Sequence, residues 1–131
     1  MLKNGSKSDK QKKLHVLIVD DDVDLADTVS DILKIEGYKT RVAHSGDEAL
    51  SAVKDQLPAL VLLDIRMGGK SGIETLKAIK EINGEIIVLM MTGSSELKFT
   101  EQASRAGASD YILKPIDFVY LKKTLSKFIT R

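Results

Sequence analysis

Short runs of consecutive apolar residues alternate along this chain with longer stretches in which apolar residues recur every three or four positions. The short runs are rich in valine, isoleucine and leucine, as expected for strands that are buried in a parallel sheet. The clearest examples are "ALVLLD" (59–64) and "EIIVLMMT" (85–92). This pattern predicts five strands, at residues 14–20, 38–44, 59–64, 85–92 and 109–114.

The stretches between the strands have helical spacing and recognisable helix ends. Gly37 is placed to close the first helix. Ser45 with Glu48, and Ser71 with Glu74, have the spacing of capping boxes at the start of the second and third helices. Helices are predicted at residues 22–37, 45–56, 71–83, 94–106 and 117–129.

The strict alternation of strands and helices predicts the fold class. Such a chain forms an α/β protein with a doubly wound, five-stranded parallel sheet and helices on both faces. The three strands richest in branched apolar residues, 14–20, 59–64 and 85–92, should be central, and the polar strand 38–44 should lie at an edge.

Polar or charged residues end four of the five predicted strands. In chain order they are Asp20-Asp21-Asp22, Asp64, Thr92 and Lys114-Pro115. Because the carboxyl ends of parallel strands lie along one edge of the sheet, where ligands bind, these side chains should converge. If the first and third strands are neighbours, their ends lie about 5 Å apart, and Asp20 or Asp21 then faces Asp64.

Clustered carboxylates repel one another and therefore need compensation. At 4 Å and an effective dielectric constant near 20, the repulsion is about 4 kcal/mol. Mg²⁺ and the ammonium group of Lys114 can offset it, since Mg²⁺ prefers one or two carboxylates together with water and phosphate oxygens. With the hydroxyl of Thr92 nearby, these groups would make a phosphoryl-transfer site in which Asp64 is the nucleophile.

Four segments, each at the end of a strand, indicate a family. They are "VLIVDDD" (16–22), "LVLLDIRM" (60–67) with Gly72, "LMMTG" (89–93) and "GASDYILKP" (107–115). In this order, and over about residues 14–130, they make the chain resemble the receiver domain of two-component response regulators. The resemblance implies the flavodoxin-like receiver fold with strand order 2-1-3-4-5 and a cis peptide bond between Lys114 and Pro115.

The resemblance also implies a role for each site residue. Asp64 would accept a phosphoryl group from a phosphohistidine on a sensor histidine kinase or a phosphotransfer protein. The cofactor would be Mg²⁺, bound by Asp64, by Asp21 directly, by Asp20 mainly through water, and by the backbone carbonyl of Arg66. Lys114 would contact the phosphoryl oxygens. Such a domain is a phosphoacceptor that dephosphorylates itself, and is not a turnover enzyme.

After phosphorylation, Thr92 would hydrogen-bond a phosphoryl oxygen and Tyr111 would follow its movement. The resemblance then implies a changed surface, formed by helix 94–106, strand 109–114 and the last helix, that meets a downstream protein or a second copy of the chain. The helix at 94–106 has few apolar anchors, so we expect its packing to shift easily. Residues expected on this surface are Lys98, Phe99, Tyr111, Lys122 and Lys123.

Two other functions remain open on the residues alone. One is a magnesium-dependent phosphatase with an aspartyl nucleophile. Such enzymes commonly have a second acid two residues after the nucleophile, where this chain has Arg66. The other is a degenerate receiver that serves only as a binding module. A flavin or nucleotide site is disfavoured, because three aspartates after the first strand would repel a phosphate and no G-x-G-x-x-G or Walker lysine is present.

Charge and composition add limits on partners and location. The whole chain carries a net charge of +1, but residues 1–13 hold five lysines and one aspartate, which leaves the rest at −3. We expect residues 1–13 to be a basic, disordered leader and 14–131 to be the receiver domain. The acidic domain argues against direct nucleic acid binding. The longest apolar run, 86–91, is far too short for a membrane span, and we expect a cytoplasmic protein without membrane contact.

Overall fold

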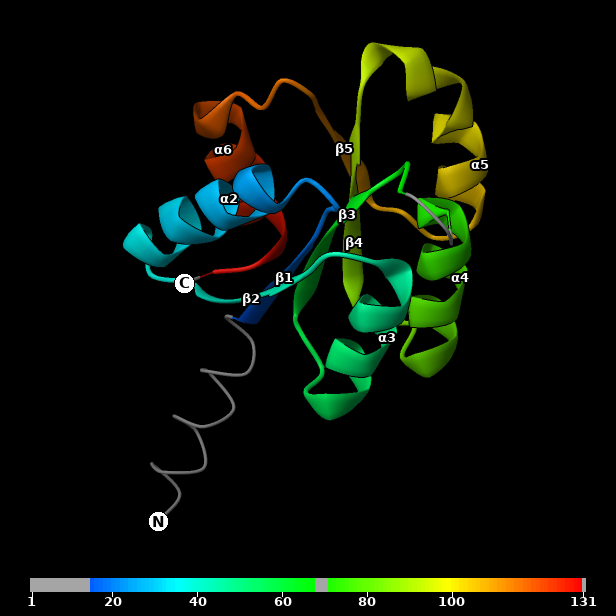
Figure 1. Cartoon of the computed structure of the whole chain (residues 1–131), viewed down its shortest axis with the longest axis horizontal. Helices are drawn as coiled ribbons and strands as arrows, with labels where there is room; N and C mark the ends of the chain where they lie inside the picture. Colours follow the sequence, from blue (N-terminus) through cyan, green and yellow to red (C-terminus); the bar gives the residue numbers. More distant parts are fainter. Residues whose placement is uncertain (1–14, 68–70, 131) are drawn as a thin grey trace.

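In the computed structural model, which describes residues 15–67 and 71–130, a five-stranded parallel sheet runs through the molecule with helices on both of its faces (Figure 1). The strand order is β2-β1-β3-β4-β5, which confirms the predicted order 2-1-3-4-5. The strands are β1 (His15–Val19), β2 (Lys39–Ala43), β3 (Leu60–Asp64), β4 (Ile87–Thr92) and β5 (Asp110–Leu113).

The helices begin and end close to the predicted positions. They are α2 (Val23–Ile35), α3 (Gly46–Asp55), α4 (Gly72–Ile82), η1 (Ser94–Phe99), α5 (Thr100–Arg105) and α6 (Phe118–Phe128). The leader expected at 1–13 lies outside the described residues. Within the described part of the chain, no helix is both long and apolar enough to cross a membrane.

Local sequence explains most helix ends. The carboxylate of Asp22 accepts a hydrogen bond from the backbone N–H of Leu25 and so caps α2, while Gly37 follows this helix with a φ of 100°. Ser71 and Glu74 form the complete capping box expected at the start of α4. At the start of α3 the hydroxyl of Ser45 accepts a hydrogen bond from the N–H of Glu48, which is one of the two hydrogen bonds of the expected capping box.

The segment at 94–106 differs from the single α-helix that the sequence predicts. Its first six residues form the 3₁₀ helix η1, and only Thr100–Arg105 is α-helical. Neither part has a side chain that caps its first turn, and Ala103 is the one buried residue of the two elements. Because so few side chains of this segment pack against the core, its first part can adopt the tighter 3₁₀ geometry.

The sheet separates two apolar layers. On one face, residues of β1, β3 and β4 pack against α3, α4 and α5, and on the other face alternate residues of the same strands pack against α2 and α6 (Figure 1). The central strands β1 and β3 are buried along their whole length, and the strand predicted to be an edge, β2, is the more exposed. This packing fixes the carboxyl ends of the central strands, where the candidate site lies.

Candidate functional site

Three carboxylates meet at the carboxyl edge of the sheet. Asp20 directly follows β1 and Asp64 ends β3, and the two strands pair in parallel with Val19 beside Leu63. Oxygen atoms of Asp20, Asp21 and Asp64 all lie within 4.8 Å of one another. Asp20 and Asp64 are buried, whereas Asp21 is exposed. The structure therefore brings together the acids that the strand-end argument predicted to converge.

Backbone N–H groups orient the two buried carboxylates. The N–H of Asp22 donates to Asp20 Oδ1 at 2.9 Å, and the N–H of Arg66 donates to Asp64 Oδ1 at 3.3 Å. In each case the donor lies two residues after the acid, and the second oxygen of each acid, Oδ2, remains directed at a cation. Each acid therefore has one oxygen held by its own loop and one available for a positive charge.

That positive charge is the ammonium group of Lys114. Its Nζ lies 2.8 Å from Asp20 Oδ2 and 3.4 Å from Asp64 Oδ2. The lysine directly follows β5, its N–H donates to the carbonyl of Thr92 at 2.8 Å, and the peptide bond to Pro115 is cis, as the resemblance implied. The lysine thus reaches the acids across β4 from the edge of the sheet.

The electrostatics of Asp64 differ from those of an ordinary surface acid. Burial, together with the negative charge of Asp20, raises the pKa of Asp64 to about 7, while Lys114 and the N–H of Arg66 act in the opposite direction. The pKa of Lys114 is raised: burial acts to lower it, but the hydrogen bond to Asp20 and the charges of both acids outweigh that effect. A buried acid with so high a pKa marks a site where another positive charge would be stabilising.

Thr92 and Tyr111 lie on the same face of the sheet. Tyr111 pairs with Met90, two residues before Thr92, and residues two apart on a strand face the same side. The buried hydroxyl of Thr92 donates to the carbonyl of Gly93 at 3.2 Å. The hydroxyl of Tyr111 is hydrogen-bonded to the carbonyl of Thr100 and to the hydroxyl of Ser104. Tyr111 therefore connects β5 to α5 in this structure.

The structure shows the contacts of three residues that were expected on the surface around Tyr111. Lys98 and Phe99 line a groove that faces α4. Lys122 pairs with Glu36, next to α2, at 3.6 Å. Their place on a surface that changes with phosphorylation stays a prediction.

Arg66 forms an ion pair that sequence reasoning did not anticipate. Its guanidinium lies 3.3 Å from the carboxylate of Glu96, which joins the segment after β3 to η1. The arginine side chain is 77% exposed, so solvent screens the pair. The two residues are 30 positions apart and belong to no common periodic pattern, so no signal in the sequence pointed to their contact.

Gly72 allows α4 to approach the end of β3 closely, a role that the sequence motif did not specify. Its N–H donates to the carbonyl of Ile65 at 3.1 Å. A Cβ atom at this position would lie 2.2 Å from the carbonyl oxygen of Asp64 and 2.7 Å from the backbone of Ile65. The first turn of α4 therefore touches the end of β3 so closely that only a glycine fits without a backbone shift.

The donor atoms of the acidic cluster fit a small, hard divalent cation. All are carboxylate oxygens, which Mg²⁺, Ca²⁺ and Mn²⁺ prefer. Three ligating residues, of which one is exposed to solvent, leave room for the several water molecules that Mg²⁺ retains. The cluster is thus able to bind a divalent metal ion.

Fold and site together define a class of protein: a doubly wound α/β domain with an acidic, lysine-paired site at the carboxyl ends of its central strands, suited to phosphoryl chemistry. The family of response regulator receiver domains matches residues 16–126. The chain belongs to this family, and its function is that of a phosphoacceptor domain in two-component signal transduction.

Individual relatives agree with this assignment. Transcriptional regulatory protein ZraR from Salmonella typhimurium is 43% identical over 115 residues, which cover 88% of this chain and 26% of the relative. The chain thus spans about a quarter of that protein's length. Sporulation initiation phosphotransferase F from Bacillus subtilis is 35% identical over 114 residues, covering 87% of this chain and 92% of the relative.

Solved structures show the same fold. The receiver domain of NtrX from Brucella abortus superposes with a TM-score of 0.82 at 38% sequence identity, covering 86% of this chain and 95% of that one. Chemotaxis protein CheY4 from Vibrio cholerae gives a TM-score of 0.83 at 27% identity, over 88% and 98% of the two chains. Receiver domains therefore match this chain over nearly all of the residues that the structure describes.

Proposed function

We propose that Asp64 is the phosphoacceptor of this domain and that it receives a phosphoryl group, in a Mg²⁺-dependent reaction, from a phosphohistidine of a sensor kinase or a phosphotransfer protein. The observation that carries the proposal is the position of Asp64. It is a buried carboxylate at the end of a central strand, with Lys114 at 3.4 Å and with oxygens of Asp20 and Asp21 within 4.8 Å.

The transfer is a nucleophilic displacement at phosphorus. Asp64 Oδ2 attacks, an O–P bond forms, the P–N bond to the donor imidazole breaks, and the imidazole leaves with the bonding electron pair and takes up a proton. Asp64 must be ionised for this attack, so its raised pKa has to be lowered by added positive charge. Lys114, which contacts both acids, supplies part of that charge and would stabilise the phosphoryl oxygens.

The bound Mg²⁺ would be held by Asp64, by Asp21, by Asp20 mainly through water, and by the backbone carbonyl of Arg66. When bound, Mg²⁺ neutralises the acids and the charge that develops on the phosphoryl oxygens. The N–H of Arg66 already orients Asp64 Oδ1, so the loop that would supply the carbonyl ligand is positioned by the acceptor itself.

Phosphorylation would be read out through Thr92 and Tyr111. A phosphoryl group on Asp64 offers Thr92 a charged acceptor, and charge-assisted hydrogen bonds are about twice as strong as neutral ones such as that to Gly93. Movement of Thr92 would free space on the face of the sheet that it shares with Tyr111. Because Tyr111 is bonded to α5, its movement would shift this short helix, and the surface of α5, β5 and α6 would then meet a downstream protein or a second copy of the chain.

The test is phosphorylation with acetyl phosphate and MgCl₂, followed by intact-protein mass spectrometry. The wild-type domain should gain the mass of one phosphoryl group, and Asp64→Asn should gain none. The matched control is Asp24→Asn, an exposed acid in the first turn of α2, which should be labelled like the wild type. Labelling of Asp64→Asn would overturn the assignment.

Together with an assay of phosphate release from a phosphomonoester, the experiment separates the two other functions. A magnesium-dependent phosphatase would release inorganic phosphate from a phosphomonoester in large molar excess over protein, whereas a phosphoacceptor releases about one equivalent for each phosphorylation event. A degenerate binding module would show no adduct under any condition. The expected result is a single adduct that requires Mg²⁺ and decays without catalytic turnover.

A further inference from the structure

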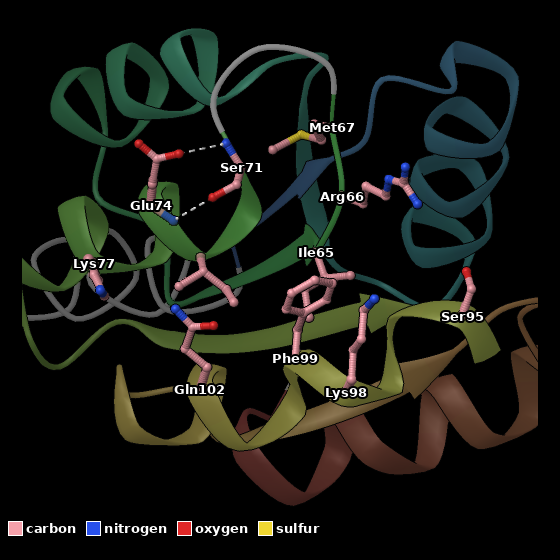
Figure 2. Close-up of a pocket in the computed structure, with 11 residues that line it drawn as sticks. Ile65, Arg66, Met67, Ser71, Glu74, Lys77, Ser95, Lys98, Phe99 and Gln102 are labelled. Atoms are coloured by element: carbon pink, nitrogen blue, oxygen red, sulfur yellow. Dashed lines mark hydrogen bonds between the residues drawn. The ribbon is translucent and has the colours of Figure 1, made fainter.

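A groove of about 660 Å³ lies beside the acidic site, between the segment that follows β3 and the helices η1 and α5. Figure 2 shows its two sides: on one side lie Ile65 and Met67, which follow β3, with Ser71 at the start of α4 and Lys77 on α4, and on the other side lie residues of η1 and α5. Of the residues that line this groove, the proposed phosphoacceptor chemistry uses only the backbone of Arg66. Its volume is within the range of sites that bind one small organic molecule, about 300–1,000 Å³.

The apolar part of the lining consists of three buried side chains and one partly exposed aromatic ring. Ile65, Met67 and Ile73 contribute side chains that are largely buried, between 4% and 7% exposed. Phe99 rises from η1 on the opposite side and is 36% exposed. The groove therefore offers a flat aromatic surface opposite aliphatic and thioether side chains, which suits a planar or branched apolar group.

The charge of the lining is positive although most of the chain is acidic. Arg66, Lys77 and Lys98 contribute three positive charges and Glu74 contributes one negative charge. The carboxylate of Glu74 accepts the N–H of Ser71 in the capping box. The rest of the chain beyond residue 13 carries a net negative charge. A positive groove in an acidic domain favours an anionic ligand.

The two lysines are the cations available to such a ligand. Arg66 already pairs with Glu96, whereas neither Lys77 nor Lys98 forms an ion pair within residues 15–67 and 71–130. Lys98 Nζ lies 5.3 Å from the centre of the Phe99 ring, which holds the ammonium group above the aromatic face. The charge and the apolar surface thus lie next to each other.

We propose that this groove binds a small organic anion with an aromatic or branched apolar body, such as an aryl carboxylate or an aryl sulfonate. The apolar body would pack between Phe99 and the side chains of Ile65 and Met67. The anionic group would be attracted by the charges of Lys77 and Lys98, which lie on either side of Phe99, with the amide of Gln102, which points into the groove, as an additional donor (Figure 2).

The groove is also coupled to the acceptor, a point that rests on the proposed function of Asp64. Ile65, Arg66 and Met67 line the groove and directly follow Asp64 in the chain. The N–H of Arg66 donates to Asp64 Oδ1, so a ligand that displaces this segment changes the contacts of the acceptor. Because linkage is reciprocal, phosphorylation must then change the affinity of the groove for its ligand.

Binding is tested with two fluorescent probes of similar shape: the anion 8-anilinonaphthalene-1-sulfonate and the neutral N-phenyl-1-naphthylamine. The anion should bind with 1:1 stoichiometry, and Lys98→Gln and Lys77→Gln should each weaken it about fivefold, as expected for loss of one partly screened charge contact. Binding of the neutral probe should stay unchanged in both variants. Phe99→Ala should weaken both probes. The matched control, Lys127→Gln on α6, should leave both affinities unchanged.

Amide NMR spectra of each variant verify the fold and locate the probe. The anion should shift resonances of 65–67, 71–77 and 95–102. The proposal is overturned if the lysine and Phe99 variants bind the anion as the wild type does, or if the shifts map to α2 and α6.

The coupling is tested separately by measuring the affinity for the anion before and after phosphorylation with acetyl phosphate, with the adduct verified by mass. A change of about threefold or more is expected. An unchanged affinity in protein that carries the adduct would overturn the coupling and leave the role of Asp64 intact. Failure to form the adduct would instead overturn the proposed function, without affecting the binding result.

Discussion

Lys114 Nζ lies 2.8 Å from Asp20 Oδ2 and is therefore closer to this acid than to the proposed acceptor, Asp64, from which it is 3.4 Å away. The lysine thus compensates Asp20 first. Asp64 is left with a pKa raised to about 7 by burial and by the neighbouring acid. In the absence of metal, the negative charge of ionised Asp64 is therefore only partly compensated.

The first prediction concerns stability and pH in the metal-free protein. The pKa of Asp64 is about 7 in the folded state and 3.8 as a reference for the unfolded state, so the folded protein binds more protons between these values. The free energy of unfolding should therefore fall as pH rises from about 4 to about 7, and the loss should be complete above that range. Asp64→Asn should remove this contribution and stabilise the protein at pH 8 by roughly 2 kcal/mol.

Urea unfolding in EDTA at several pH values measures this effect. Asp55→Asn is the control, because Asp55 is a largely exposed acid that pairs with Arg41 on the surface, and it should not produce the same pH-dependent gain. A gain for Asp64→Asn that is equal at pH 4 and pH 8 would contradict the assignment of the titration to Asp64.

The second prediction concerns metal binding. Asp21→Ala should abolish the Mg²⁺-dependent increase in melting temperature, because Mg²⁺ is bound by few protein ligands and each one matters. Lys114→Met should leave the Mg²⁺ affinity unchanged or increased, since a cation close to Asp20 and Asp64 has been removed. Calorimetric titration with MgCl₂ gives both affinities, with Asp24→Ala as a control. Wild-type affinity in Asp21→Ala would exclude this site.

The third prediction concerns the contact between α4 and β3. Gly72→Ala should destabilise the protein by about 2–3 kcal/mol, because the added methyl group would collide with the carbonyl oxygen of Asp64. The rate of phosphorylation should fall as well, since relief of the collision moves the acceptor. Gly84→Ala is a matched control: there the nearest atom to a Cβ is the carbonyl oxygen of Lys80, 3.8 Å away. Equal stability of the two variants would show that the close approach at Gly72 is relieved at little cost.

The fourth prediction separates the switch from the chemistry. Tyr111→Phe removes the hydroxyl that is bonded to Thr100 and Ser104, and should cost about 1 kcal/mol. Hydrogen exchange in 100–105 should become faster, because Ala103 then remains as the main anchor of α5. Phosphorylation of Asp64 should proceed at the wild-type rate. Tyr120→Phe, on an exposed position of α6, should change neither quantity.

The sequence predicted the fold well because the relevant patterns are local. Apolar runs of strand length, helical spacing and capping residues are properties of neighbouring residues, and the strands at 59–64 and 85–92 were found within two residues of their observed bounds. The convergence of Asp20, Asp64 and Lys114 followed from the geometry of parallel strands, which places all carboxyl ends along one edge. The strand order itself came from the family resemblance.

The sequence did not predict which way the side chains of the segment 94–105 point or which contacts exposed charged residues make. Only Ala103 of the segment 94–105 is buried, so the pattern could not show that Phe99 faces α4 or that the segment begins as a 3₁₀ helix. The ion pair of Arg66 with Glu96 likewise joins the segment after β3 to η1, which lies far away in sequence. A third contact was not predicted either: the ammonium group of Lys80 donates to the carbonyl of Ile86 at 2.5 Å. In the sequence, Lys80 looks like any basic residue in the last turn of a helix.

The division of the apolar interior by the sheet has a consequence for how such a domain diversifies. Residues of α2 and α6 pack on one side and those of α3, α4 and α5 on the other, with the strands between them. Substitutions that share no neighbours have additive effects on stability. A lineage can therefore alter one side to suit a new partner without a compensating change on the other side. The exception is the carboxyl edge, where residues that follow β1 and β5 meet around Asp64, and where one change affects several charged contacts at once.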